Sequence, residues 1–233
     1  MRGKLIALER QITECTRCPR LVEYRERVAV EKRRAFRDQE YWGRPVPAFG
    51  DPNAEILIIG LAPAAHGANR TGRMFTGDRS GDFLYRALYS VGLASQPESV
   101  SIGDGLKLKN VFITAAARCA PPDNKPTPAE IQNCRPYLAL ELELLKTVRV
   151  VVALGRIAFD DYLTLLRIRG DIERRSDFVF AHNRLHDFGE SRPKLISSYH
   201  PSQQNTSTGK LSFEMLRDVF VQAQGLVDPA KSG

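Results

Sequence analysis

Four cysteines give this 233-residue chain its clearest opportunity for metal chemistry. Cys15 and Cys18 form a C-x-x-C pair, Cys119 follows an apolar run, and Cys134 lies in a helical pattern. Because these are all the cysteines of the chain, a single four-thiolate site would use every one of them. Four thiolates in a tetrahedron suit zinc or a 4Fe-4S cluster. Such a site would link the N-terminal segment to the rest of the chain.

Two other interpretations of the cysteines stay open. Two or three of them could be ordinary buried residues, because one C-x-x-C pair is a weak signal. A thioredoxin-like dithiol is disfavoured, since Cys15 and Cys18 do not follow a first strand. The long gap between Cys18 and Cys119 also departs from the compact spacing of zinc ribbons.

A long glycine-rich loop is the second feature that suggests chemistry. It runs from Gly60 to Gly81, between an apolar run at 55–59 and a helical pattern. Loops of this length are uncommon in compact domains and are usually functional or disordered. Its apolar side chains Met74 and Phe75 argue against disorder, and its glycines allow the backbone to approach a ligand closely. The loop therefore predicts a ligand site at the carboxyl end of a strand.

Polar residues near the strand ends could contact the same ligand. His200 and the hydroxyl of Ser202 follow the apolar run at 194–198. His200 alone is equally consistent with a hydrogen-bonded structural histidine. Asp78 lies in a Gly-Asp-Arg-Ser-Gly segment that is typical of a turn, and we expect Asp82 to cap the next helix. The loop lacks the Lys and Ser/Thr of a P-loop, and no strand is followed by G-x-G-x-x-G, which disfavours the usual nucleotide-binding motifs.

Alternating strands and helices must position these residues. Apolar, β-branched runs predict four buried parallel strands, at 55–59, 111–114, 148–154 and 194–198. Helical patterns follow at 82–93, 128–145, 156–166 and 212–222. Thr127, Pro128 and Glu130 form a helix start with a capping box. We therefore expect one α/β domain over residues 1–233, with helices on both sheet faces and a charged helical arm at 5–37.

The charge of the chain limits its partners. It has 34 Lys and Arg residues against 27 Asp and Glu residues, a net charge of +7. This excess favours a polyanionic partner such as nucleic acid or a membrane surface, unless it is only a basic surface. No apolar segment is long enough to span a membrane, and charges come too early for a secretory signal. We expect an intracellular, cytoplasmic monomer.

These motifs together resemble the family 5 (type b) uracil-DNA glycosylases. The matching segments are 60–64, 72–78, 118–126 and 200–202, together with the four cysteines. The resemblance covers the chain from Cys15 to about Val219. It implies a three-layer α/β/α sandwich with a central four-stranded parallel sheet. It also implies a 4Fe-4S cluster on Cys15, Cys18, Cys119 and Cys134, and removal of uracil from double- or single-stranded DNA.

The resemblance assigns roles to single residues. It implies that Asp78 stabilises positive charge on the sugar and orients a water, and that His200 stabilises the departing base. Contacts to the base and the DNA would come from Gly60, Leu61, Ala62, Ala64, Phe75, Asn124 and Ser202. A base inside a duplex must be flipped into a pocket before it can react, and Phe75 is placed to stack on it, unless it is only a core aromatic.

One departure from the related family 4 enzymes bears on specificity. Those enzymes carry an asparagine at the position of Ala115, where it reads uracil, and alanine cannot make that hydrogen bond. We therefore expect relaxed selectivity that includes hypoxanthine. Two rival functions stay open: a non-catalytic nucleic-acid-binding module with a structural four-cysteine metal site, and an iron–sulfur redox protein. The first rival leaves the glycine-rich loop and Asp78 without a role.

Overall fold

A mixed six-stranded sheet forms the middle layer of the computed structural model, which describes residues 2–228. The strands lie in the order β1-β3-β2-β4-β6-β5. Their bounds are β1 Phe49–Gly50, β2 Ile56–Gly60, β3 Val111–Ala115, β4 Val150–Leu154, β5 Arg184–His186 and β6 Lys194–Ser198. The four inner strands are parallel, whereas β1 and β5 pair antiparallel at the edges. The predicted parallel sheet is confirmed as the centre of a larger sheet.

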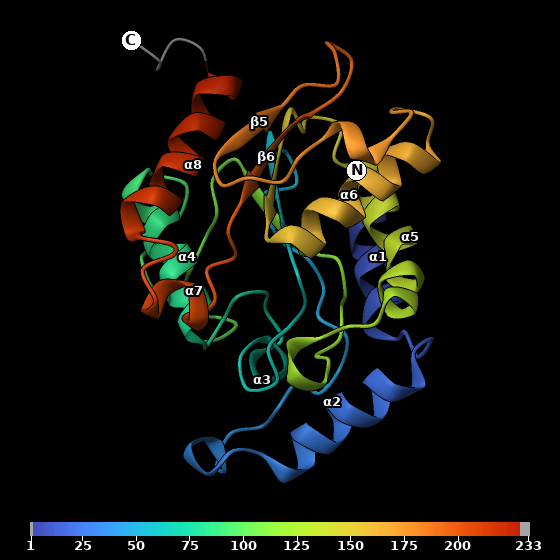
Figure 1. The fold of residues 1–233 in the computed structure, drawn as a ribbon. Helices are drawn as coiled ribbons and strands as arrows, with labels where there is room; N and C mark the ends of the chain where they lie inside the picture. The colour runs from blue at the N-terminus through green and yellow to red at the C-terminus, as the bar shows by residue number, and fades with distance from the viewer. Residues whose placement is uncertain (1, 229–233) are drawn as a thin grey trace.

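Helices cover both faces of the sheet, as predicted for a three-layer α/β/α sandwich. Their bounds are α1 Arg2–Thr13, α2 Pro19–Glu31, α3 Ala68–Thr71, α4 Arg79–Ser90, α5 Pro128–Leu144, α6 Arg156–Ile168, α7 Gln203–Ser207 and α8 Phe213–Val227. In Figure 1, α4, α7 and α8 lie on one side of the strands, and α1, α5 and α6 lie on the other. Within residues 2–228, no helix has both the length and the apolar character needed to cross a membrane.

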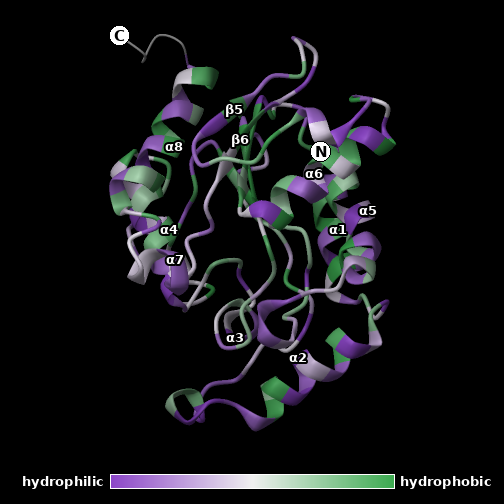
Figure 2. Ribbon diagram, viewed as in Figure 1, coloured by the Kyte–Doolittle hydropathy of each residue, from purple (hydrophilic) through white to green (hydrophobic). Residues whose placement is uncertain are grey.

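Strand residues alternate between two hydrophobic cores. Ile56 and Ile58 of β2 pack with α4 and α8, whereas Leu57 and Ile59 pack with α5 and α6. All four side chains are fully buried, and burial of a side chain of this size contributes about 1.5–3 kcal/mol. Figure 2 shows hydrophobic strands in the middle of the molecule and mixed colours on the helices. Burial on both faces explains why the inner strands are continuous apolar runs in the sequence.

The N-terminal arm consists of two helices with the C-x-x-C pair between them. Helix α1 packs on α5, and α2 contacts α3. Helix α5 begins with the predicted capping box, in which Thr127 Oγ1 accepts from the Glu130 N–H at 3.3 Å. The Glu130 carboxylate accepts from the Thr127 N–H at 2.7 Å and from Arg20 of α2 at 2.7 and 2.8 Å. The cap of α5 therefore also anchors the arm.

The start of α4 corrects one prediction. The helix begins at Arg79 and its N-cap is Asp78, whereas Asp82 lies exposed in the first turn. Gly81 made the segment resemble a turn in the sequence. In the structure, a Cβ on Gly81 would stand 1.8 Å from the carbonyl oxygen of Phe75. The glycine therefore allows the first turn of α4 to pack closely on the backbone of Phe75.

Candidate active site and cysteine cage

The carboxyl ends of β2 and β4 mark the switch point of the sheet, where the chain connections leave in opposite directions. From β2 the chain continues to β3 on one side and then crosses to β4 on the other. In open α/β sheets, ligands bind outside the strand ends at such a switch point. The loop after β2, Gly155 after β4 and His200 after β6 all lie at these strand ends.

Three close contacts to glycine organise these strand ends. A Cβ added to Gly60 would lie 2.7 Å from the Phe75 ring, and one added to Gly67 would lie 1.9 Å from Asp78 Oδ2. A Cβ added to Gly155 would lie 3.2 Å from the Cβ of His200. The phenyl ring, the carboxylate and the imidazole therefore each rest against a glycine. We call the following residues the strand-end site: Gly60, Gly67, Phe75, Asp78, Gly155 and His200.

Phe75 lies at the centre of the strand-end site. Its ring centroid is 6.0 Å from that of His200, and the two ring planes are inclined by 31°. The backbone of Phe75 is left-handed, with φ of +52°, which is rare for a bulky residue and strained. Contacts with Gly60 and Gly81 on either side of the residue hold it in this conformation. The half-buried ring therefore has a fixed orientation beside His200.

Asp78 is a half-buried carboxylate at the N-terminus of α4. Its Oδ1 accepts a hydrogen bond from the Gly81 N–H at 3.0 Å. Burial raises the pKa of Asp78, and the nearby Asp82 charge adds to this effect. The N–H groups of Ser80 and Gly81 and the charge of Arg70 act in the opposite direction. The site therefore holds a carboxylate in a poorly solvated position with specific donors to its ionised form.

His200 supplies a neutral imidazole. Burial lowers its pKa from 6.5 to about 4, so the ring is uncharged at neutral pH. A neutral imidazole carries one N–H donor and one acceptor nitrogen. The backbone of His200 is fixed by Asn205, whose Nδ2 donates to the His200 carbonyl at 2.8 Å. The residue can therefore donate one hydrogen bond without adding positive charge.

The predicted backbone segment of the loop lies beside the end of β3. The carbonyl of Leu61 accepts from the Ala117 N–H at 3.0 Å, and that of Ala64 accepts from the Gly67 N–H at 3.2 Å. Ala62 and Ala64 are both partly exposed. Ala115 is buried and pairs in register with Gly60. Ala115, for which the sequence predicts a part in base selectivity, is therefore adjacent to the strand-end site.

Asn124 and Ser202 have other surroundings. Asn124 is exposed in a 3₁₀ turn, Pro122–Asn124, on the connection between β3 and α5, and its φ is +56°. Ser202 is the N-cap of α7, and its Oγ accepts from the Asn205 N–H at 3.4 Å. The hydroxyl of Ser202 thus has a structural role. Contact of either residue with DNA stays a prediction.

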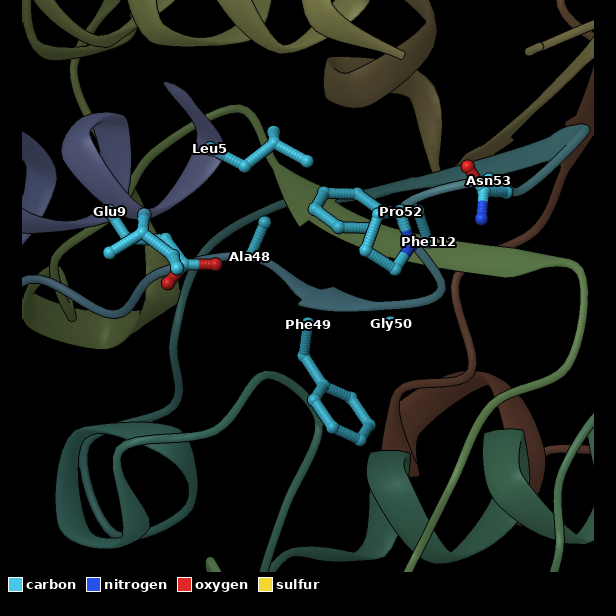
Figure 3. Close-up of a pocket in the computed structure, with 9 residues that line it drawn as sticks. Leu5, Glu9, Ala48, Phe49, Gly50, Pro52, Asn53 and Phe112 are labelled. Carbon is cyan, nitrogen blue, oxygen red and sulfur yellow. The ribbon is translucent and has the colours of Figure 1, made fainter. Parts of the chain in front are cut away.

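A cavity of about 710 Å³ lies elsewhere, between α1 and the edge strand β1 (Figure 3). Leu5 and Glu9 of α1, Phe49 of β1 and Phe112 of β3 are among its lining residues. No member of the strand-end site lines it. Its size alone does not make it the candidate active site, because it lacks the carboxylate and imidazole pair found at the strand ends.

The four cysteines line one small cavity, and their use as ligands of a shared site stays a prediction. Cys15 and Cys18 precede α2, Cys119 follows β3, and Cys134 lies in α5. All four are free thiols, and three of them are buried. We call these four residues the cysteine cage. Their convergence joins the arm to two segments of the core.

The number of thiols in the cage bears on which metal group it could bind. Within residues 2–228, no three His, Cys, Asp or Glu side chains form a group that could hold one metal ion. A closed zinc site needs four sulfur atoms at about 2.3 Å from a single ion. In a 4Fe-4S cluster each thiolate binds a different iron, so the sulfur atoms stand farther apart. The four thiols that line the cavity supply the ligand number that either group needs.

Two buried arginines line the same cavity. Arg25 Nη1 donates to Cys119 Sγ at 3.1 Å. Arg118, only 1% exposed, donates through Nη2 to Glu141, while its Nε and Nη1 have no hydrogen-bond partner among the described residues. Burial raises the pKa of Cys119 to about 11 and that of Cys134 to about 12. Thiolates in this cavity therefore need positive charge beside them, and the arginines supply part of it.

Comparison with known proteins identifies the family to which this chain belongs. A family model described as the uracil DNA glycosylase superfamily matches residues 47–224. This chain belongs to that superfamily. A Type-5 uracil-DNA glycosylase of Thermus thermophilus is 51% identical over 220 residues, which cover 94% of this chain and 97% of the relative. One of Mycobacterium tuberculosis is 51% identical over 225 residues, covering 96% and 82%.

A more distant member is similar over less of the chain. A Type-4 uracil-DNA glycosylase of Archaeoglobus fulgidus is 31% identical over 169 residues, which cover 67% of this chain and 70% of that protein. The superfamily model includes the whole strand-end site together with Cys119 and Cys134, but it begins after Cys15 and Cys18. The matches to Type-5 glycosylases, which span 94–96% of the chain, extend into the arm.

Proposed function

We propose that this member of the uracil DNA glycosylase superfamily is a repair enzyme that hydrolyses the N-glycosidic bond of uracil in DNA and leaves an abasic site. The name of its Type-5 relatives supports uracil in DNA as the substrate. The observation that carries the proposal is the strand-end site, where a carboxylate, a neutral imidazole and an aromatic ring adjoin the sheet's switch point.

Asp78 acts on the sugar. Cleavage of a glycosidic bond builds positive charge on the sugar ring, and a carboxylate stabilises that charge. With Oδ1 held by the Gly81 N–H, Asp78 is oriented at the helix terminus. It directs a water whose oxygen forms a bond to the anomeric carbon as the bond to the base nitrogen breaks. The base leaves with the electron pair, and the water supplies the proton that restores the neutral base.

His200 and the loop backbone act on the departing base. Negative charge develops on the oxygens of uracil as the bond breaks, and donors fixed in advance stabilise such charge. The neutral His200 ring supplies one N–H, and the backbone amides of Leu61, Ala62 and Ala64 are candidates for the others. Burial maintains the neutral state of His200, so the donor is available without a proton being taken up first.

Phe75 and Ala115 determine which base is accepted. The fixed ring of Phe75 stacks on the flipped base, as aromatic side chains do in enzymes that extrude a nucleotide. Ala115, beside Gly60, supplies no hydrogen bond to distinguish uracil from other deaminated bases. Hypoxanthine is therefore a second substrate in this proposal. The net charge of +7 provides contacts to phosphates that do not depend on the base sequence.

The cysteine cage holds a 4Fe-4S cluster in this proposal. The shared cavity of the four thiols and the unpartnered donors of Arg118 support this assignment. When bound, the cluster would supply a covalent link between the arm and the core. Cys15 and Cys18 would provide two thiolates from the arm, and Cys119 and Cys134 would provide two from the core. The iron and sulfide content of the purified protein, with its visible absorption, tests this point.

Base release from a defined duplex tests the function. An end-labelled duplex with one uracil is mixed with excess enzyme and then treated with alkali, which cuts only where a base has been lost. We expect cleavage at the uracil position and not in a duplex with thymine there. A duplex with one hypoxanthine tests the wider selectivity. Intact DNA in every duplex, with binding retained, would overturn the proposal in favour of a non-catalytic nucleic-acid-binding module.

A further inference from the structure

Arg70 of α3 contacts both backbone segments that hold the Asp78 carboxylate. The arginine is 8% exposed, and its Nε donates to the carbonyl of His66 at 2.8 Å. Its Nη2 donates to the carbonyl of Gly77 at 2.9 Å. His66 precedes Gly67, against which Asp78 Oδ2 rests, and Gly77 precedes Asp78 itself. One guanidinium therefore connects the two segments on either side of the carboxylate.

The same side chain contacts the end of the N-terminal arm and the segment that follows it. Arg70 Nη1 donates to Gln39 Oε1 at 2.5 Å, and the guanidinium carbon lies 4.0 Å from the centre of the Phe36 ring. A second contact joins the segment after the arm to the loop, because the Tyr41 hydroxyl hydrogen-bonds His66 Nδ1 at 3.1 Å. All the guanidinium nitrogens of Arg70 are thus used, and Nη1 is directed to the segment just after the arm. Sequence analysis gave no signal for Arg70, since arginines are frequent in this basic chain.

Few charges surround Asp78. Arg70 faces it from α3 and Asp82 from α4, while Tyr41 and His66 are the other titratable groups next to the guanidinium. Burial, the largest effect, and the charge of Asp82 raise the pKa of Asp78, whereas the charge of Arg70 lowers it. His66 adds little charge, because its own pKa is lowered by burial and by neighbouring arginines. The charge of Arg70 thus favours the ionised form of Asp78.

We propose that Arg70 is a positioning residue for Asp78, through which the N-terminal arm fixes the catalytic carboxylate. The inference rests on the proposed role of Asp78 in base removal. A planar guanidinium can donate in several fixed directions at once, which a lysine ammonium cannot reproduce. Phe36 at the end of the arm and Gln39 just after it hold the guanidinium, and the guanidinium holds the backbone on both sides of the carboxylate. The arm therefore contributes to the reaction without contacting the substrate.

The pH dependence of single-turnover base release separates this role from a purely structural one. Arg70→Met removes both the hydrogen bonds and the charge. We expect its rate at neutral pH to fall about tenfold or more, and the acid limb of its pH–rate profile to move up by about one pH unit. Arg70→Lys keeps the charge, so its rate should fall while its acid limb stays at the wild-type pH. Gln39→Ala should lower the rate a few-fold, also without moving the limb.

Controls make the outcomes distinct. Arg167, exposed near the end of α6 at the opposite edge of the sheet, gives a matched charge removal as Arg167→Met and should behave like wild type. An acid limb that is unchanged in Arg70→Met, in protein with wild-type circular dichroism and DNA affinity, would overturn the inference about Arg70. Full activity of Asp78→Asn would instead overturn the proposed role of Asp78, so the two failures are separable.

Discussion

The strand-end site and the cysteine cage hold their functional groups in different ways. In the strand-end site, Phe75 and His200 rest against Gly60 and Gly155 at strand ends, and Asp78 rests against Gly67 before α3, so position is set by local packing. In the cage, the side chains come from the arm, from the segment after β3 and from α5. Changes at the strand ends should therefore reduce rate before stability, and changes in the cage should reduce stability before rate.

The largest effect on stability should come from removing one thiol of the cage. Cys134→Ser removes the thiolate supplied by α5, and with it the link from the arm to that helix. We expect the free energy of unfolding to fall by about 3 kcal/mol or more, with loss of bound iron. Urea denaturation and iron analysis measure both quantities. Ala129→Ser, at an exposed position of the same helix, is the control. Equal stability of Cys134→Ser and wild type would remove the distinction between the two regions.

A smaller effect, on rate alone, should follow from Gly67→Ala. The new Cβ would stand 1.9 Å from Asp78 Oδ2, so the carboxylate must move. We expect single-turnover base release to slow about 100-fold, which corresponds to about 2.7 kcal/mol, with little change in DNA affinity. Gly3→Ala is the matched control, because nothing lies within 4 Å of the added Cβ. Wild-type rates in Gly67→Ala would show that the position of Asp78 is not critical.

The neutral state of His200 should appear in the pH dependence of stability. Its pKa falls from 6.5 to about 4 on folding, so the unfolded chain binds the proton first as pH decreases. Stability from this residue is complete above pH 6.5 and is lost as the pH falls toward 4. Comparing urea denaturation of wild type and His200→Asn, we expect their difference in unfolding free energy to fall by about 3 kcal/mol between pH 7 and pH 4. A difference that is independent of pH would contradict a buried neutral imidazole.

The smallest effect concerns base selectivity. Ala115→Asn places an amide beside Gly60, where it can hydrogen-bond one base edge and oppose another. We expect the ratio of uracil to hypoxanthine release to rise about tenfold, or about 1.4 kcal/mol of discrimination. The ratio is measured in one preparation, so differences in the active fraction cancel. An unchanged ratio would mean that Ala115 does not contact the flipped base.

The inner sheet could be predicted because its strands are buried on both faces. The apolar runs at 55–59 and 111–114 match β2 and β3 to within one residue at each end. The edge strands β1 and β5 could not be predicted, since two or three residues are too few for a periodic pattern. The sequence also placed His200 after an inner strand and Asp78 in the loop after another, and their roles stay predictions.

What the sequence did not reveal depends on contacts between distant segments. Asp82 was expected to cap α4, because Gly81 disguised the earlier start at Arg79. Arg70 was missed because its partners Gln39 and Gly77 come from different segments. The cage illustrates the opposite case: the sequence placed its four cysteines together despite the long gap, although spacing alone could not distinguish zinc from a cluster.

Single-turnover base release by Asp78→Asn tests the central claim most directly. Asparagine caps a helix about as well as aspartate, so α4 should stay intact while the negative charge is lost. Asp82→Asn removes the neighbouring carboxylate charge as the matched control. We expect Asp78→Asn to bind uracil-containing duplex like wild type and to release the base about 10³-fold more slowly, while Asp82→Asn stays within a few-fold of wild type. Wild-type rates in Asp78→Asn would contradict the account.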